Sequence, residues 1–134
     1  RSTYLAGYYK YKAGDQFTEG GKPVNGKRDI CDIYAIMYET SESVPTLDGT
    51  NAFTSPNLIS TARINNAKET NEWTYFKLPF TTLPGKFIDK EKLMDGKYNI
   101  AIVFTSSLEG NHFNGAIGST LLIDEAELIY HSED

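Results

Sequence analysis

Alternation with a period of two residues restricts the fold of this chain more than any other feature. It is clearest in the segment Trp73–Phe80, where the even-numbered positions from Phe76 onward are all apolar. A repeat of two is that of a β-strand, whose side chains point alternately to opposite faces. Patterns with the 3.6-residue repeat of a helix are nearly missing, so the sequence predicts an all-β fold. Six segments have strand character: Tyr4–Lys12, Ile30–Glu39, Leu58–Ile64, Trp73–Phe80, Lys97–Ser107 and Ser119–His131.

The segments between the predicted strands favour a sandwich with crossing connections. Residues 14–28 and 40–57 are rich in Gly, Pro and polar residues, and both are longer than a hairpin turn. Ile30–Glu39 is apolar on both faces apart from Asp32, as expected for a central strand. Residues 88–94 form the one predicted helical turn. We therefore expect a jelly-roll or Greek-key β-sandwich, and 134 residues fit one domain over 1–134.

Composition and charge exclude several classes of protein. The chain is 40% hydrophobic and 23% charged, which is typical of a globular domain and excludes intrinsic disorder. Its net charge of −5 leaves no basic stripe for a nucleic acid backbone, so no nucleic acid partner is expected. Cys31 is the only cysteine, so no internal disulfide can form. Because it lies in an apolar run, we expect a buried and unreactive thiol.

Aromatic residues make up 13% of the chain and suggest a sugar-binding surface. Trp73, Tyr75 and Lys77 share one face of their predicted strand, opposite the apolar face. The C–H face of a sugar packs on aromatic rings, and polar side chains around the rings bond its hydroxyls. This trio is therefore a candidate glycan surface, on which Trp73 and Tyr75 stack against sugar. The alternative is that these rings pack between the two sheets with only their polar atoms at the rim.

A second predicted strand carries residues that are expected to extend this surface. Asp32, Tyr34 and Tyr38 share one side of that strand, although Ile36 makes the same side partly apolar. Asp32 is the predicted hydroxyl-bonding residue of the three. As with the first trio, the tyrosines have the alternative role of core residues with their hydroxyls at an edge.

The loop over residues 106–115 is the other candidate binding region. It is dense in side chains that bond hydroxyls, and loops at the ends of sandwiches often hold ligands. Asn111 and His112 are its predicted sugar contacts. The alternative is that its asparagines and glycines only supply the positive φ angles that tight turns need.

Three carboxylates near the end of the chain raise the questions of catalysis and of a metal. Alternation predicts that Glu125 and Glu127 share a face opposite Asp124, with about 6–7 Å between neighbours on that face. This spacing is compatible with a glycosidase pair, but exposed carboxylates more often form a solvated face. Sugar-binding jelly rolls often carry Ca²⁺, and Asp124 is the candidate metal ligand. We predict no other cofactor and no catalytic residue.

Several segments resemble a family of Bacteroidetes proteins called the putative carbohydrate metabolism domain. The most specific pieces are Cys31-Asp32-Ile33-Tyr34 and Gly115-Ala116-Ile117-Gly118-Ser119-Thr120. Further similar pieces are Gly7–Lys12 and Phe104–Ser107, and the resemblance extends from about Tyr8 to about Leu128. It implies a jelly-roll sandwich similar to carbohydrate-binding modules.

The resemblance also implies a cellular setting. Such a domain typically forms the C-terminal part of an exported and often lipid-anchored protein, behind an immunoglobulin-like domain. The chain carries neither that upstream domain nor a lipobox cysteine, and it is short for the family. We therefore expect residues 1–134 to be the C-terminal part of a longer exported protein. Its location would be the cell surface, in association with the outer membrane, and the upstream domain would be its partner.

Together these inferences predict a non-catalytic module that binds glycan on an aromatic face. Two alternatives from other classes stay open: a protein-interaction or adhesion domain, and a glycoside hydrolase. A broad apolar patch without a groove would favour the first alternative. A deep cleft with two facing carboxyl groups would favour the second. The identity of the glycan and the oligomeric state are not encoded in any motif.

Overall fold

The computed structural model of the chain describes residues 3–42, 47 and 52–130. Its elements in chain order are β1 (Thr3–Lys12), β2 (Phe17–Glu19), β3 (Lys22–Pro23), β4 (Asp32–Glu39), β5 (Leu58–Arg63), β6 (Thr70–Pro79), β7 (Thr81–Thr82), α1 (Lys90–Met94), β8 (Tyr98–Thr105), the 3₁₀ turn η1 (Gly110–His112), β9 (Asn114–Ala116) and β10 (Thr120–Tyr130). The predicted all-β fold is confirmed, and each of the six predicted strands is present with ends shifted by a few residues.

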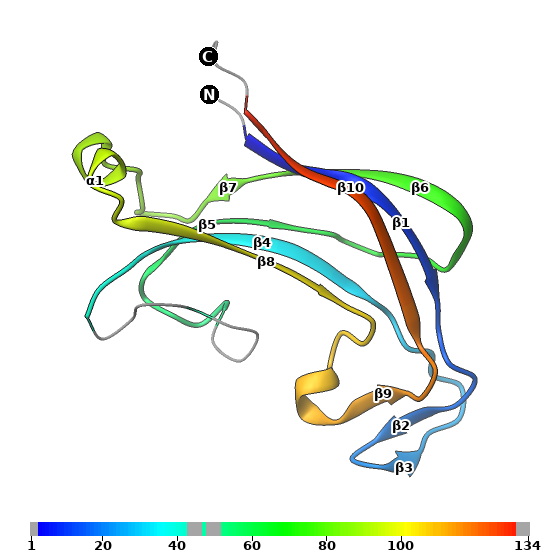
Figure 1. Cartoon of the computed structure of the whole chain (residues 1–134). Helices are drawn as coiled ribbons and strands as arrows, with labels where there is room; N and C mark the ends of the chain where they lie inside the picture. Colours follow the sequence, from blue (N-terminus) through cyan, green and yellow to red (C-terminus); the bar gives the residue numbers. More distant parts are fainter. Residues whose placement is uncertain (1–2, 43–46, 48–51, 131–134) are drawn as a thin grey trace.

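Two antiparallel sheets form the sandwich (Figure 1). The first, with strand order β10-β1-β6, is called the β1 sheet here, and the second, with order β7-β5-β4-β8, is called the β4 sheet. A small third sheet, β3-β2-β9, lies at one end and uses parts of the predicted loops. Neighbours in the sheets are often distant in sequence, as a sandwich with crossing connections requires. Thr3 lies opposite Tyr130, at the end of the sandwich away from η1 (Figure 1).

The main core lies between the two sheets. Leu5, Tyr9 and Tyr11 of β1 point inward and contact Ile33 and Ala35 of β4 in one buried cluster. The repeat of two residues along each strand explains this directly, because every second side chain faces the opposite sheet. Exclusion of these apolar surfaces from water is the main force that holds the sheets together.

The strand β4 is buried on both faces, as its apolar composition predicts. Its second face carries Tyr34, Ile36 and Tyr38, which form a separate buried cluster with Leu58 of β5 and with Leu47 from the connection between β4 and β5. Parts of that connection, residues 43–46 and 48–51, lie outside the described residues. The long connection after β4 therefore contributes to a second core on the outer side of the β4 sheet.

The strand β8 departs from its predicted burial. The alternation of β8 predicts a core face, yet Ile102 and Phe104 are 42% and 37% exposed. Their cross-strand partners on β4, Ala35 and Ile33, are fully buried. This exposure follows from the place of β8 at the edge of its sheet. An edge strand has a neighbour on one side only, so its inward-facing side chains are less covered than those of β4.

The helical turn predicted for residues 88–94 is confirmed as α1. Asp89 caps it, because its Oδ1 accepts hydrogen bonds from the backbone N–H groups of Glu91 at 2.9 Å and Lys92 at 3.2 Å. The helix has no buried residue. Among the described residues, none of the helical segments has the length and apolarity needed to cross a membrane.

Cys31 is buried, as predicted, and this makes its chemistry testable. It is 2% exposed, and burial raises the pKa of its thiol from 9.0 to about 11. A rise of two units leaves about a hundredfold less thiolate near pH 8, and the thiolate is the reactive form. We expect iodoacetamide to alkylate the native chain at least a hundredfold more slowly than the urea-unfolded chain at pH 8. Mass spectrometry of timed aliquots measures both rates, and equal rates would contradict a buried thiol.

Candidate functional site

A cavity of about 550 Å³ opens on the outer face of the β4 sheet. Its floor comes from three adjacent strands, because Tyr34 of β4 pairs with Arg63 of β5 and with Val103 of β8. The same register places Asp32 opposite Thr105, one step further along. Cross-strand partners share a face, so these five side chains gather on one side of the sheet.

Two connecting segments form the walls of the cavity. Phe53 and Thr54 come from the connection between β4 and β5. Ser107, Glu109 and His112 come from the segment that leaves β8 and passes through η1. The cavity thus lies where the second apolar cluster ends and the two connections meet.

An ion pair between β4 and β5 forms part of the cavity floor. The Nη2 atom of Arg63 is 2.7 Å from Oδ2 of Asp32, and its Nε atom is 3.2 Å from Oδ1. This is a bidentate pair, which fixes the plane of the guanidinium as well as its position. Asp32 is only 3% exposed, whereas the Arg63 side chain is 42% exposed.

Aromatic rings support the arginine. The guanidinium carbon of Arg63 lies 4.2 Å from the ring centroid of Phe53 and 5.6 Å from that of Tyr34. The two rings are themselves 4.8 Å apart and meet edge to face at 60°. Stacking of a guanidinium on rings restricts its motion further, so Arg63 is held from two directions.

The structure brings three of the predicted site residues together. Asp32, Tyr34 and His112 all line the cavity. Tyr38 does not, because it is 2% exposed inside the second apolar cluster. The backbone of Asn111 lies in η1, but its side chain is outside what the structure describes.

The predicted continuous aromatic surface is wrong. Trp73, Tyr75 and Lys77 lie on β6 in the β1 sheet, whereas Asp32 and Tyr34 lie on β4 in the other sheet. The alternation within each strand is as expected, but the order of strands places the two groups in different sheets. They form two separate surfaces.

The surface around Trp73 is exposed but uneven. Trp73 and Tyr75 are 45% and 52% exposed, so these rings are not sealed between sheets. The ring of Tyr75 lies 5.2 Å from that of Tyr8 at 55°, and the Lys10 ammonium lies 4.8 Å above the Trp73 ring. The Tyr75 ring is thus tilted against Tyr8, and one face of the Trp73 ring contacts a cation.

The carboxylates of β10 are separated by a bulge. Asp124 lies opposite Tyr8 and Glu127 opposite Ala6, which are on the same side of β1. Glu125 lies between them with a positive φ of 51°, so the predicted common face of Glu125 and Glu127 is wrong. Asp124 uses Oδ1 to accept the backbone N–H of Glu125 at 2.9 Å. Within the described part of the chain, no three His, Cys, Asp or Glu side chains gather as a metal site would require.

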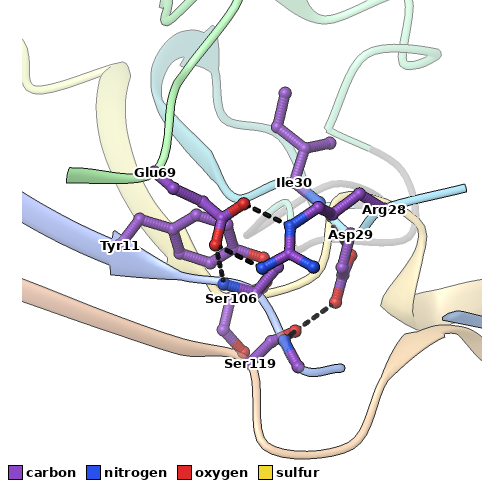
Figure 2. A network of polar contacts seen from close by, with 9 residues as sticks. Tyr11, Arg28, Asp29, Ile30, Glu69, Ser106 and Ser119 are labelled. Atoms are coloured by element: carbon purple, nitrogen blue, oxygen red, sulfur yellow. Dashed lines mark hydrogen bonds and ion pairs between the residues drawn. The ribbon is translucent and has the colours of Figure 1, made fainter. Parts of the chain in front are cut away.

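A buried carboxylate ties the cavity wall to the rest of the fold. Oδ2 of Asp29 accepts hydrogen bonds from the hydroxyls of Ser107 at 2.5 Å and Ser119 at 2.6 Å, and from the backbone N–H of Ala116 at 3.0 Å. Its Oδ1 accepts the N–H of Ile30 at 2.9 Å. Figure 2 shows Asp29 beside Ser119 within this network. Asp29 thereby joins the segments before β4, after β8 and before β10.

Neighbouring polar contacts extend the network in Figure 2. The hydroxyl of Tyr11 donates to the carbonyl of Ser106 at 2.7 Å, and burial raises its pKa to about 12. Glu69 accepts hydrogen bonds from Arg28 and from the backbone N–H of Ala13, and the Arg28 contact lowers its pKa to about 2. These groups anchor the start of the loop that follows β1.

Three residues that line the cavity are not predicted from the sequence: Arg63, Phe53 and Glu109. Arg63 is the only charged residue in the predicted strand Leu58–Ile64, but its partner depends on the pairing of β4 with β5. Phe53 lies in a long connection, where no repeat assigns a direction to its side chain. Glu109 lies within the predicted loop over residues 106–115, and its acidic side chain next to Gly110 is the one signal available.

A family model described as the putative carbohydrate metabolism domain matches residues 1–129. The chain belongs to this family. The match confirms the resemblance seen in the sequence and places this putative carbohydrate metabolism domain among domains related to carbohydrate metabolism. No curated protein is similar enough to the chain to count as a match.

Two crystal structures are similar to this putative carbohydrate metabolism domain. One, a putative glycoside hydrolase from Bacteroides thetaiotaomicron, is 87% identical over 98% of the chain, with a TM-score of 0.95. The other, a putative glycoside hydrolase from Bacteroides vulgatus, is 45% identical over 96% of the chain, with a TM-score of 0.87. The chain spans 39% of the first protein and 52% of the second. Each relative therefore has a large portion without a counterpart in residues 1–134.

Proposed function

We propose that this domain binds glycan without cleaving it, in the cavity on the outer face of the β4 sheet. The observation that carries the proposal is the combination of Arg63, held by Asp32, with the exposed ring of Phe53 in one concave site, while the buried Tyr34 supports both from below. A sugar needs both an apolar surface for its C–H groups and polar partners for its hydroxyls. A volume of about 550 Å³ lies within the usual range for small-ligand sites.

The polar groups at the rim suit hydroxyl recognition. The exposed His112 and the half-buried Glu109 lie on the wall opposite the floor strands. Glu109 is held in place, because its Oε1 accepts a hydrogen bond from Nδ2 of Asn114 at 3.2 Å. Fixed donors and acceptors lose little freedom on binding, which favours recognition of a polar ligand.

Alanine variants at Phe53 and His112 test the site. Both side chains line the cavity at its surface, so their removal is expected to leave the fold intact. We expect F53A to weaken binding roughly tenfold through loss of ring contact, and H112A to weaken it severalfold. Isothermal titration with the best oligosaccharide from a glycan array measures both changes.

Trp73→Ala is the matched control for that experiment. It removes an exposed aromatic ring from the other sheet, where sequence analysis predicts the stacking residues. If glycan binds in the cavity, W73A leaves the affinity unchanged while F53A lowers it. If W73A lowers the affinity and F53A does not, the glycan binds on the β1 sheet instead. If neither variant changes the affinity, the glycan binds at neither surface.

Glycoside cleavage is the second candidate, because two carboxylates are among the described residues that line the cavity, and both relatives are described as putative glycoside hydrolases. Both oxygens of Asp32 are engaged by Arg63, so among these described residues Glu109 is the carboxylate available as a general acid. Incubation of the chain with the bound oligosaccharide, followed by a reducing-end assay, decides between the candidates. We expect no new reducing ends. If reducing ends are released by the wild-type chain and not by the Glu109→Gln variant, the domain is a glycoside hydrolase.

We also propose that the domain works at the cell surface as part of a longer exported polypeptide. The family resemblance supports this setting, and the relatives' additional length supports a multi-domain context. Protease treatment of intact producing cells is expected to remove the domain, and its protection until lysis would contradict a surface location.

A further inference from the structure

We infer that the cavity selects neutral glycans over acidic ones, because Asp32 cancels the charge of Arg63 while leaving its remaining N–H groups to bond hydroxyls. This inference rests on the proposed glycan-binding function and names the class of ligand. The selection depends on one ion pair and is testable without knowing the individual sugar.

Arg63 is the only lysine or arginine among the described residues that line the cavity. Arginine is the side chain best shaped to hold a carboxylate, so Arg63 would be the main partner of an acidic sugar in this cavity. That position is already taken, because Asp32 contacts Nη2 at 2.7 Å and Nε at 3.2 Å. A uronate or sulfate would have to compete with a carboxylate that is covalently part of the site.

The remaining charges oppose an acidic ligand as well. The carboxylate of Glu109 lines the same cavity, and the whole domain carries a net charge of −5. An acidic sugar beside Arg63 would add its negative charge next to those of Asp32 and Glu109. Repulsion between like charges is strong where water is partly displaced, so acidic ligands bind more weakly.

A neutral sugar meets none of these penalties. A guanidinium has five N–H groups, of which Asp32 occupies two, so donors remain for hydroxyl or ring oxygens. The Arg63 side chain is 42% exposed, whereas Asp32 is nearly covered. Arg63 is therefore the ligand contact, and Asp32 is a positioning residue that acts through it. The Phe53 ring, 4.2 Å from the guanidinium, offers the adjoining apolar contact.

The test compares neutral oligosaccharides with their acidic counterparts. The probes are carboxyl-reduced against unmodified oligogalacturonate, which share one linkage, and xylan against glucuronoxylan, measured at pH 8 in 50 and 500 mM NaCl. We expect the neutral member of the bound pair to bind at least tenfold more tightly. Its affinity should change less than twofold with salt, because no net charge is paired on binding.

Asp32→Asn reverses the charge balance and is the decisive variant. Asparagine has the same shape and keeps one acceptor for Arg63, but the cation is no longer cancelled. We expect D32N to bind the acidic member at least tenfold better relative to the neutral one, and that gain should vanish in 500 mM NaCl. A purely structural role for Asp32 would instead lower both affinities in parallel.

Asp124→Asn is the control for net charge, because it removes one exposed carboxylate from the other sheet. It should leave the preference for the neutral member unchanged.

If D32N proves unstable in a thermal melt, the preference of the wild-type domain and its salt dependence still test the inference. If the acidic member of the pair binds as tightly as the neutral member, or more tightly, the inference is wrong, although the proposed glycan binding is upheld. Failure of every neutral and acidic probe to bind would overturn the proposed function as well.

Discussion

Replacement of Asp29 by alanine is expected to lower the free energy of unfolding by about 3–5 kcal/mol. The carboxylate is buried and accepts four hydrogen bonds, from two serine hydroxyls and two backbone N–H groups. Hydrogen bonds to a charged acceptor contribute about 1.5–3 kcal/mol each, and buried donors without a partner add a desolvation penalty. Since Ala116 and Ile30 donate from the backbone, neither donor can turn toward another acceptor.

Urea unfolding followed by circular dichroism measures the effect of D29A. D124A is the control, because Asp124 is exposed and accepts its hydrogen bond from the adjacent backbone N–H of Glu125. It should change the free energy of unfolding by no more than about 1 kcal/mol. We also expect D29N to remain well below wild type, because its amide nitrogen cannot accept the N–H of Ala116 or Ile30. A loss of less than about 1 kcal/mol in D29A would show that the network does not hold the three segments together.

The second large effect is expected from Gly14→Ala. A Cβ atom at this position would lie 2.2 Å from the carbonyl oxygen of Ile117 and 2.9 Å from its carbonyl carbon. These are backbone atoms, and the N–H of Gly14 is held by the hydroxyl of Ser119 at 3.0 Å, so neither of the two connecting segments can yield easily. We expect a loss of about 3 kcal/mol, at the upper end of the range for overpacking. In a domain of this size that loss lowers the melting temperature by about 10 °C.

Gly110→Ala is the matched control for the glycine experiment. Its Cβ would meet nothing closer than the Cβ of Ser107 at 3.6 Å, which is ordinary contact. Differential scanning calorimetry should show a melting temperature within about 2 °C of wild type for G110A. An equal and small change in both variants would mean that the loop after β1 moves away from Ile117 without penalty.

The sequence predicts the strands well, because alternation is a local property. Trp73–Phe80 alternates and forms most of β6, and the apolar run after Asp32 marks β4 as a strand buried on both faces. Both conclusions need only the direction of each side chain relative to its neighbours. The thiol of Cys31 is buried for the same local reason.

The order of strands depends on distant contacts, and this is where prediction from the sequence fails. Neither the edge position of β8 nor the placement of β4 and β6 in different sheets can be obtained from a repeat of two residues. Phe104 is therefore more exposed than its pattern predicts, and Trp73 lies on a different surface from Asp32. Arg63 enters the site only through the register between β4 and β5.

The pairing of Thr3 with Tyr130 brings the start of β1 and the end of β10 together. Both residues lie at one end of the sandwich, whereas η1 and the Asp32 end of β4, which border the cavity, lie toward the other (Figure 1). The ends of this strand pair are thus separated from the cavity by the length of the sandwich. If the domain is tethered at this end, the proposed binding site lies toward the opposite end, and a long glycan could reach it without crossing the attachment point.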